Sequence, residues 1–206
     1  VTPQAIAEDI QRIRALAETE GRDSSSLRFV TAITVITAET DKAAQAKFRD
    51  YQQYISEEAA LALFSAWTGI DWSQEDLDTP LAFRETEACR SALASLTRID
   101  DQQSWTLRDA AQYIGIGGLH PLLVGGAESI ADQLEAFAAE SGVDGFNLAW
   151  AISPGSFTDF ITYVMPVLRQ RGRLRSQPGQ PSTLRERLFG QAQLSTDHPI
   201  SRFRRF

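Results

Sequence analysis

Residues 124–148, VGGAESIADQLEAFAAESGVDGFNL, constrain the fold of this chain more than any other stretch. A short apolar run ends in two glycines, and a helix is expected to follow, with Ile130 and Leu134 on one side. Gly142 should end this helix, and residues 143–148 should form a buried strand. A helix that leads into a buried strand is a half-unit of α/β proteins, so we expect an α/β chain.

The chain before residue 124 is expected to supply a second strand between helices. Residues 2–20 predict an amphipathic helix that Thr2 caps. Residues 27–36, LRFVTAITVI, are rich in β-branched side chains and predict a strand that is buried on nearly both faces. A long helix with an alanine-rich body should then run from about residue 41 to about Phe64.

Residues 67–84 follow no helical or strand period and contain two tryptophans, a glycine and a proline. We interpret them as an excursion out of the core fold. Such a segment could cover a pocket, or Trp67 and Trp72 could simply anchor a long loop. The sequence favours neither alternative.

Three further helices are predicted around the stretch at 124–148. Residues 87–99 should form one, and residues 107–114 should form a second that Gly115 ends. Residues 156–171 predict the last long helix, which Pro166 should kink.

Charge is unevenly spread along the chain. The net charge is −7, but residues 169–206 hold nine arginines against Glu186 and Asp197, which gives this part about +7 and the rest about −14. A basic tail could bind nucleic acid, yet the acidic remainder argues against a phosphate-binding surface. We favour a tail from residue 173 that is extended or partly ordered and lies on the acidic body or on a partner chain.

Length and composition favour an ordinary globular domain. The 206 residues are 43% apolar, which is enough for a sizeable core. The single Cys89 excludes a disulfide framework and fits a reducing compartment, so we expect a cytoplasmic protein without a membrane span. The sequence opens at Val1 directly with a helix-start signal, which predicts a processed protein or the latter part of a longer one.

Residue spacing alone does not predict a reaction. His198 lies in the tail and is expected to be exposed, and no His/Cys/Asp cluster has metal-ligand spacing, so we expect no metal. Residues 115–118 resemble a phosphate-binding loop, but they follow a helix rather than a strand, so the context of a dinucleotide fingerprint is missing.

Ordered motifs along the chain resemble one known family. Residues 124–148 are similar to the VGTPEQIAD and GAADGFNL segments of the bacterial-luciferase-like flavin monooxygenases, in the branch of nitrilotriacetate monooxygenase, dibenzothiophene-sulfone monooxygenase and pristinamycin IIA synthase. Further segments that resemble this branch are Thr68-Gly69-Ile70-Asp71, residues 77–80, Thr106-Leu107-Arg108, Gly118-Leu119-His120, Pro154-Gly155, Asp159-Phe160, residues 164–168, Arg171-Gly172 and residues 183–186.

The resemblance implies a TIM-like (β/α)8 barrel that binds reduced FMN at the carboxyl ends of its strands. Its family oxygenates a small organic substrate with O2, and a separate NAD(P)H:flavin reductase supplies the reduced flavin. The resemblance also implies an oligomer, with no nucleic-acid or membrane partner.

The same resemblance implies that this chain is the C-terminal part of a barrel, helix-rich when isolated. Residues 27–36 would be strand seven and residues 143–148 strand eight, so the first six strands and the main flavin-phosphate segments would come from an N-terminal barrel portion or a second chain. The expected division is residues 1–172, with an excursion at 67–118, and a tail at 173–206. The alternative is a non-enzymatic assembly or binding module derived from the family.

Six candidate site residues follow from the resemblance. His120 would be catalytic, donating a hydrogen bond to a flavin oxygen or a peroxide; its alternative is a packing histidine. Asn147 would bind the isoalloxazine edge or satisfy local backbone groups, and Arg90 would hold an anionic substrate group or form a surface salt bridge. The full set is His120 as catalytic residue, Gly118, Leu119 and Asn147 at the cofactor, and Arg90 and Trp150 at the substrate.

Two local departures from the branch affect these expectations. Gly126-Ala127 replaces the Thr-Pro pair at a helix start, which weakens that cap. Asp100 or Asp101 stands where the sulfone monooxygenases carry a histidine implicated at the site, which argues against a sulfone substrate.

Overall fold

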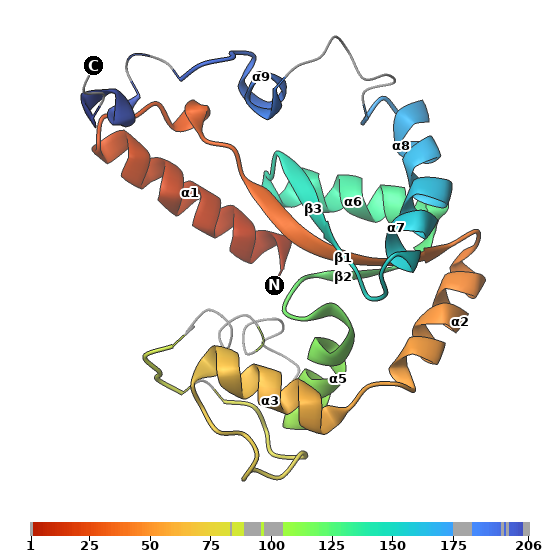
Figure 1. Cartoon of the computed structure of the whole chain (residues 1–206). Coiled ribbons are helices and arrows are strands. Elements are labelled where there is room, and N and C mark those ends of the chain that lie inside the picture. Colours follow the sequence, from red (N-terminus) through yellow and green to blue (C-terminus); the bar gives the residue numbers. More distant parts are fainter. Residues whose placement is uncertain are drawn as a thin grey trace.

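The computed structural model describes residues 2–82, 84–88, 96, 105–174, 183–194, 196 and 198–203. At its centre is a three-stranded parallel sheet with the order β2-β1-β3 (Figure 1). The strands are β1 (Val30–Ala38), β2 (Leu122–Gly126) and β3 (Gly145–Ala149).

Strand β1 is longer than its neighbours, and each neighbour pairs with a different half of it. The residues from Val30 to Thr34 pair with β3, and those from Thr34 to Ala38 pair with β2. Thr34 is therefore opposite both Leu122 and Ala149, at the point where the three strands meet.

Helices surround the sheet and continue away from it (Figure 1). Their bounds are α1 Pro3–Thr19, α2 Asp41–Gln52, α3 Glu57–Thr68, α5 Leu107–Gly117, α6 Ala127–Ser141, α7 Gly155–Asp159, α8 Met165–Gln170 and α9 Leu184–Phe189. Short 3₁₀ turns span Ser24–Ser26 and Pro199–Phe203, and a π-helical turn spans Phe160–Val164.

One face of the sheet is covered by α6 and by the helical segment from α7 to α8. Ile33 and Val35 of β1 point to this face and pack against Ile130, Leu134 and Val164. Because side chains alternate along a strand, Ala32 and Thr34 point to the opposite face, together with their register partners Asn147 and Ala149. On that second face, Ala32, Thr34, Asn147 and Ala149 form a patch of small and polar side chains where β1 pairs with β3.

A second core lies between α3 and α5, which pack side by side below the sheet in Figure 1. Gly69 ends α3 in the left-handed conformation, and the chain returns so that Trp72 stacks on Phe64 with ring centroids 5.4 Å apart. The indole nitrogen of Trp72 donates a hydrogen bond of 3.0 Å to the hydroxyl of Thr68. Trp72 therefore anchors the excursion, as one of the two alternatives expected.

The long helix expected from residue 41 to Phe64 is wrong, because the chain forms α2 and α3 instead. Ser56 starts the second helix, since its hydroxyl accepts a hydrogen bond from the amide of Ala59. The expected end of a helix at Gly115 is also wrong, since α5 continues to Gly117. A Cβ at Gly115 would lie 2.6 Å from the side chain of Ile55, so this glycine permits close packing inside the helix.

The sequence did not predict β2 or α9. Thr183 and Glu186 form a reciprocal capping box at the start of α9, in the tail that was expected to be extended or partly ordered. Helix α9 lies on the body of the protein, where Arg28 donates to the carbonyl of Leu188 and its guanidinium lies over the ring of Phe189. Part of the tail therefore docks on its own chain.

The remaining helix predictions are partly confirmed. Thr2 caps α1, as predicted. The last long helix is interrupted by the π-helical turn, which ends shortly before Pro166 and accommodates it. Most of the helix expected at residues 87–99 lies outside the described residues. Within this range, the described residue Leu96 is helical and buried.

Candidate active site

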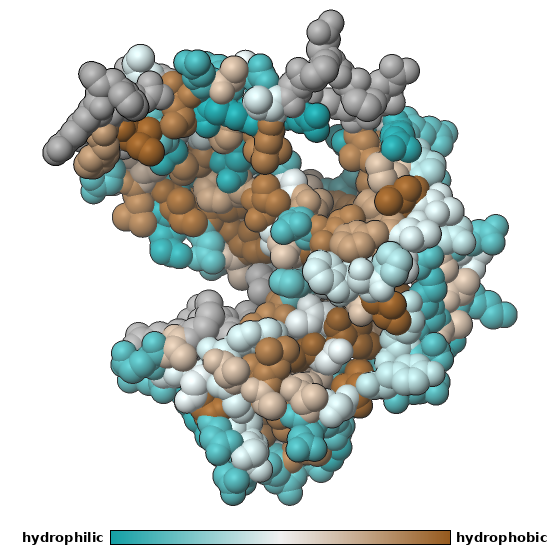
Figure 2. Space-filling model, viewed as in Figure 1, coloured by the Kyte–Doolittle hydropathy of each residue, from teal (hydrophilic) through white to brown (hydrophobic). Residues whose placement is uncertain are grey.

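A hollow of about 580 Å³ lies against the second face of the sheet, at Thr34 and Ala149. Figure 2 shows a deep notch with apolar surface between α1 and the α3–α5 unit. The hollow lies between the sheet and the α3–α5 unit. Its lining residues are Thr34, Leu63, Trp67, Ile114, Ile116, Gly117, Gly118, Leu119, His120, Ala149 and Trp150.

Gly118 shapes the loop that enters this hollow. Its backbone ends α5 with φ at 63° and ψ at −136°, which side chains other than hydrogen rarely permit. A Cβ on Gly118 would lie 3.8 Å from the indole of Trp67, which therefore packs close to the loop. The loop and α3 form one wall of the hollow.

The loop is held to the sheet by Thr34. The hydroxyl of Thr34 donates a hydrogen bond of 3.3 Å to the carbonyl of Gly117, and its amide donates one of 2.9 Å to the carbonyl of Pro121. From α5, the hydroxyl of Tyr113 donates a bond of 2.5 Å to the carbonyl of His120. The backbone around His120 is therefore fixed from both sides, and His120 lines the hollow.

Tyr113→Phe should lower the free energy of unfolding by about 1 kcal/mol at neutral pH, because the carbonyl of His120 loses its donor. Burial raises the pKa of Tyr113 to about 12. The folded value lies above the unfolded value of about 10, so the penalty for ionising the buried phenol is absent below pH 10 and destabilises the fold progressively as pH rises towards 12.

The wild-type protein should therefore lose roughly 2 kcal/mol more between pH 9 and pH 12 than the Tyr113→Phe variant. Urea unfolding across this range measures the difference. Tyr54→Phe is the matched control, because Tyr54 is 79% exposed and should change neither quantity. Parallel pH dependence in wild type and Tyr113→Phe would contradict the expectation.

Four of the six predicted site residues line the same hollow, namely Gly118, Leu119, His120 and Trp150. Asn147 lies on the same sheet face as Ala149 but is not among the lining residues, and it is exposed. Arg90 lies outside the described residues. The roles assigned to all six stay predictions.

The sequence did not assign site roles to Trp67, Leu63, Thr34 or Tyr113. Trp67 was expected in the excursion, but it lies in α3 and lines the hollow, while Trp72 anchors the chain that follows. Thr34 is one of three threonines in β1, with Thr31 and Thr37, so the sequence does not distinguish it.

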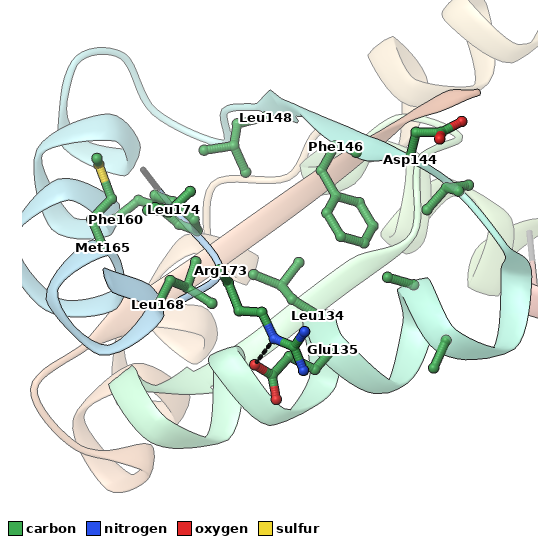
Figure 3. Close-up of a pocket in the computed structure, with 14 residues that line it drawn as sticks. Leu134, Glu135, Asp144, Phe146, Leu148, Phe160, Met165, Leu168, Arg173 and Leu174 are labelled. Atoms are coloured by element: carbon green, nitrogen blue, oxygen red, sulfur yellow. Dashed lines mark hydrogen bonds and ion pairs between the residues drawn. The ribbon is translucent and has the colours of Figure 1, made fainter. Parts of the chain in front are cut away.

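A larger hollow of about 710 Å³ lies on the opposite, helix-covered face (Figure 3). Phe146 and Leu148 point into it from β3, and Arg173 pairs with Glu135 at a distance of 2.8 Å at its edge. It extends to Asp144 and Gly145 at the amino end of β3, and none of the predicted site residues lines it. Since barrel enzymes act at the carboxyl ends of their strands, the smaller hollow is the better candidate.

Comparison with known proteins decides the family. Residues 1–145 match the luciferase-like monooxygenases. The chain belongs to this family. It is 44% identical over 194 residues to the dimethyl-sulfide monooxygenase of Hyphomicrobium sulfonivorans. The matched region covers 93% of this chain and 40% of that relative.

Solved structures confirm the fold of this luciferase-like chain. The crystal structure of DmoA from Hyphomicrobium sulfonivorans superimposes with a TM-score of 0.84 at 42% identity, over 98% of this chain and 43% of DmoA. The riboflavin lyase RcaE, solved with modified FMN and riboflavin, gives a TM-score of 0.83 at 33% identity over 100% of this chain and 45% of RcaE. The chain thus spans less than half the length of these relatives, and its α/β structure corresponds to part of a luciferase-like TIM barrel.

Two further observations concern possible ligands and membranes. Among the described residues, no group of three or more His, Cys, Asp or Glu side chains is arranged to hold a metal ion. No helix in the described part of the chain is long and apolar enough to cross a membrane.

Proposed function

We propose that this chain is the C-terminal part of a two-component, flavin-dependent monooxygenase that oxygenates a small organic substrate with O2. Residues 1–172 contribute to the barrel, with the excursion at 67–118, and residues 173–206 form the tail. An N-terminal barrel portion or a second chain completes the barrel. An NAD(P)H:flavin reductase supplies reduced FMN, and the completed protein is oligomeric.

The observation that carries this proposal is the hollow at Thr34. It brings the loop with Gly118 and His120 against Ala149 and Trp150, at the carboxyl end of β3. Strands β1 and β3 are parallel neighbours, as strands seven and eight of a barrel are. Four of the six predicted site residues line this hollow, and the carboxyl ends of strands are where barrel enzymes act, which supports the proposal.

The hollow fits the ring system of a flavin. Its volume lies within the range of about 300–1,000 Å³ that is typical of cofactor pockets, and its lining is aromatic and aliphatic. The described lining side chains include no lysine or arginine, so the FMN phosphate would be held elsewhere. This agrees with a site whose phosphate-binding segments belong to the N-terminal barrel portion.

The residues of this chain have separate roles in the proposed site. His120 donates a hydrogen bond to a flavin oxygen, Gly118 and Leu119 contact the ring, and Asn147 binds its polar edge. Trp150 contacts the substrate, and Arg90 stays a candidate for an anionic substrate group. The apolar walls exclude water, which protects reactive species from side reactions. Bound reduced flavin supplies the electrons that activate O2.

FMN fluorescence tests the proposal directly. The chain is titrated into FMN alone and together with the N-terminal barrel portion, and quenching is expected at least in the second case. Quenching in neither arrangement would reject the proposal and would favour the non-enzymatic assembly module.

His120→Gln should lower kcat/KM of the completed enzyme by about tenfold to a hundredfold, because a positioned donor at the reacting centre is lost. Steady-state oxygenation with the reductase present measures this. His198→Gln is the matched control, since His198 lies in the tail, and should leave the rate unchanged. Equal rates for the two variants would assign His120 to packing.

A further inference from the structure

We infer that the hollow at Thr34 selects uncharged, apolar substrates; this rests on the proposed function and specifies its substrate class. Aside from His120, the described lining residues carry no ionisable side chain. The polar exception is Thr34, whose hydroxyl already donates to the carbonyl of Gly117. The walls that remain for a substrate are formed by Leu63, Trp67 and Trp150.

The two described arginines of the neighbouring α3–α5 unit pair with carboxylates and do not line the hollow. Arg108 binds Glu57 at 3.2 Å and Asp78 at 3.0 Å, and it does not line the hollow. Arg84 binds Glu75 at 2.9 Å and lies over the ring of Trp72. A carboxylate entering the hollow would lose hydration without gaining a cation from these described residues.

The two tryptophans come from different parts of the fold and are each supported by packing. Trp67 lies near the end of α3 and packs against the core between α3 and α5. Trp150 follows β3 and packs on Phe157 with ring centroids 5.7 Å apart. An apolar molecule held between the sheet and the α3–α5 unit removes aromatic surface from water, which favours its binding.

A matched pair of ligands tests the inference in the completed, FMN-loaded protein. Isobutyl methyl sulfide and (methylthio)acetate have the same branching, but a carboxylate in the second replaces an isopropyl group. Dissociation constants from tryptophan fluorescence should favour the sulfide by roughly tenfold or more, because the carboxylate is desolvated without a counter-charge. Tighter binding of the carboxylate, equal binding, or binding of neither ligand would overturn the inference.

Substitution of Leu63 gives an independent test of the same wall. Leu63 is 43% exposed on α3, so a long polar side chain is tolerated there. Leu63→Arg should raise affinity for (methylthio)acetate about tenfold relative to wild type, while the uncharged control Leu63→Gln should not. If wild type prefers the carboxylate and Arg90→Gln abolishes that preference, Arg90 binds an anion and the inference fails.

FMN quenching in the same samples distinguishes failure of the inferred substrate class from failure of the proposed function. A protein that binds FMN but prefers the carboxylate retains the proposed function and loses only the substrate class. A completed protein that does not bind FMN loses both.

Discussion

Trp72→Ala is expected to lower the free energy of unfolding by about 4 kcal/mol, the largest effect of any substitution proposed for this chain. Trp72 is only 2% exposed and lies at the centre of the core between α3 and α5. Its removal leaves a cavity beside Phe64, ends the hydrogen bond to Thr68, and removes the aromatic face over which the Arg84 guanidinium lies. Urea denaturation followed by circular dichroism measures the loss.

Two variants separate the causes of this loss. Trp72→Phe keeps an aromatic ring next to Phe64 but removes the indole donor, and should cost about 1–2 kcal/mol. Trp150→Ala removes the same side chain from a position that is 57% exposed, and should cost under about 1 kcal/mol. Comparable losses for Trp72→Ala and Trp150→Ala would show that the α3–α5 unit does not depend on its core.

Gly126→Ala is expected to destabilise the fold by about 3 kcal/mol, because the added methyl group meets backbone atoms that cannot rotate away. A Cβ at Gly126 would lie 2.8 Å from the amide nitrogen of Asp41 and 2.9 Å from the carbonyl carbon of Thr40. The amide of Gly126 also donates a hydrogen bond of 2.7 Å to the carboxylate of Asp41. The substitution therefore pushes β2 away from the turn between β1 and α2.

Gly145→Ala is the matched control for Gly126→Ala. Gly145 also lies at the end of a strand, but a Cβ there meets no atom within 4 Å. Thermal and urea unfolding of both variants should show a loss only for Gly126→Ala. A similar loss for Gly145→Ala would mean that flexibility of the chain, rather than contact with Asp41, determines the cost.

The sequence predicted elements best where local signals and packing agree. Thr2 and Pro3 provide a cap and a first helical residue, and α1 begins there. The β-branched run in residues 27–36 predicted β1, and Gly142 ends α6 as expected. In each case the local sequence signal is sufficient to predict the element, because no distant contact opposes it.

The failures occur where a distant contact decides the structure. Gly115 reads as a helix end, but the side chain of Ile55 occupies the space that the glycine leaves, so the helix continues. Strand β2 is five residues long and ends in two glycines, and it forms against the carboxyl half of β1. Neither contact is visible in a short window of sequence.

The candidate site could be predicted only in part for the same reason. Family resemblance selected the loop at Gly118 and His120, and these residues do line one hollow with Trp150. It did not select Tyr113, whose contribution is a hydrogen bond to a backbone carbonyl and leaves no motif in the sequence. Residues that position a site are harder to recognise than residues that face its ligand.

The staggered pairing of β1 determines where this sheet can grow. Across the described strands, Val30 to Ile33 pair only with β3, and β3 pairs only with β1. The segment from Val30 to Ile33 of β1 and strand β3 therefore each have one edge whose backbone amides and carbonyls have no partner among the described strands. The two edges run in the same direction, because β1 and β3 are parallel. Such edges are templates for further strands and, when uncovered, for unwanted association. In the proposed barrel, these two strand edges are where the N-terminal barrel portion joins this chain.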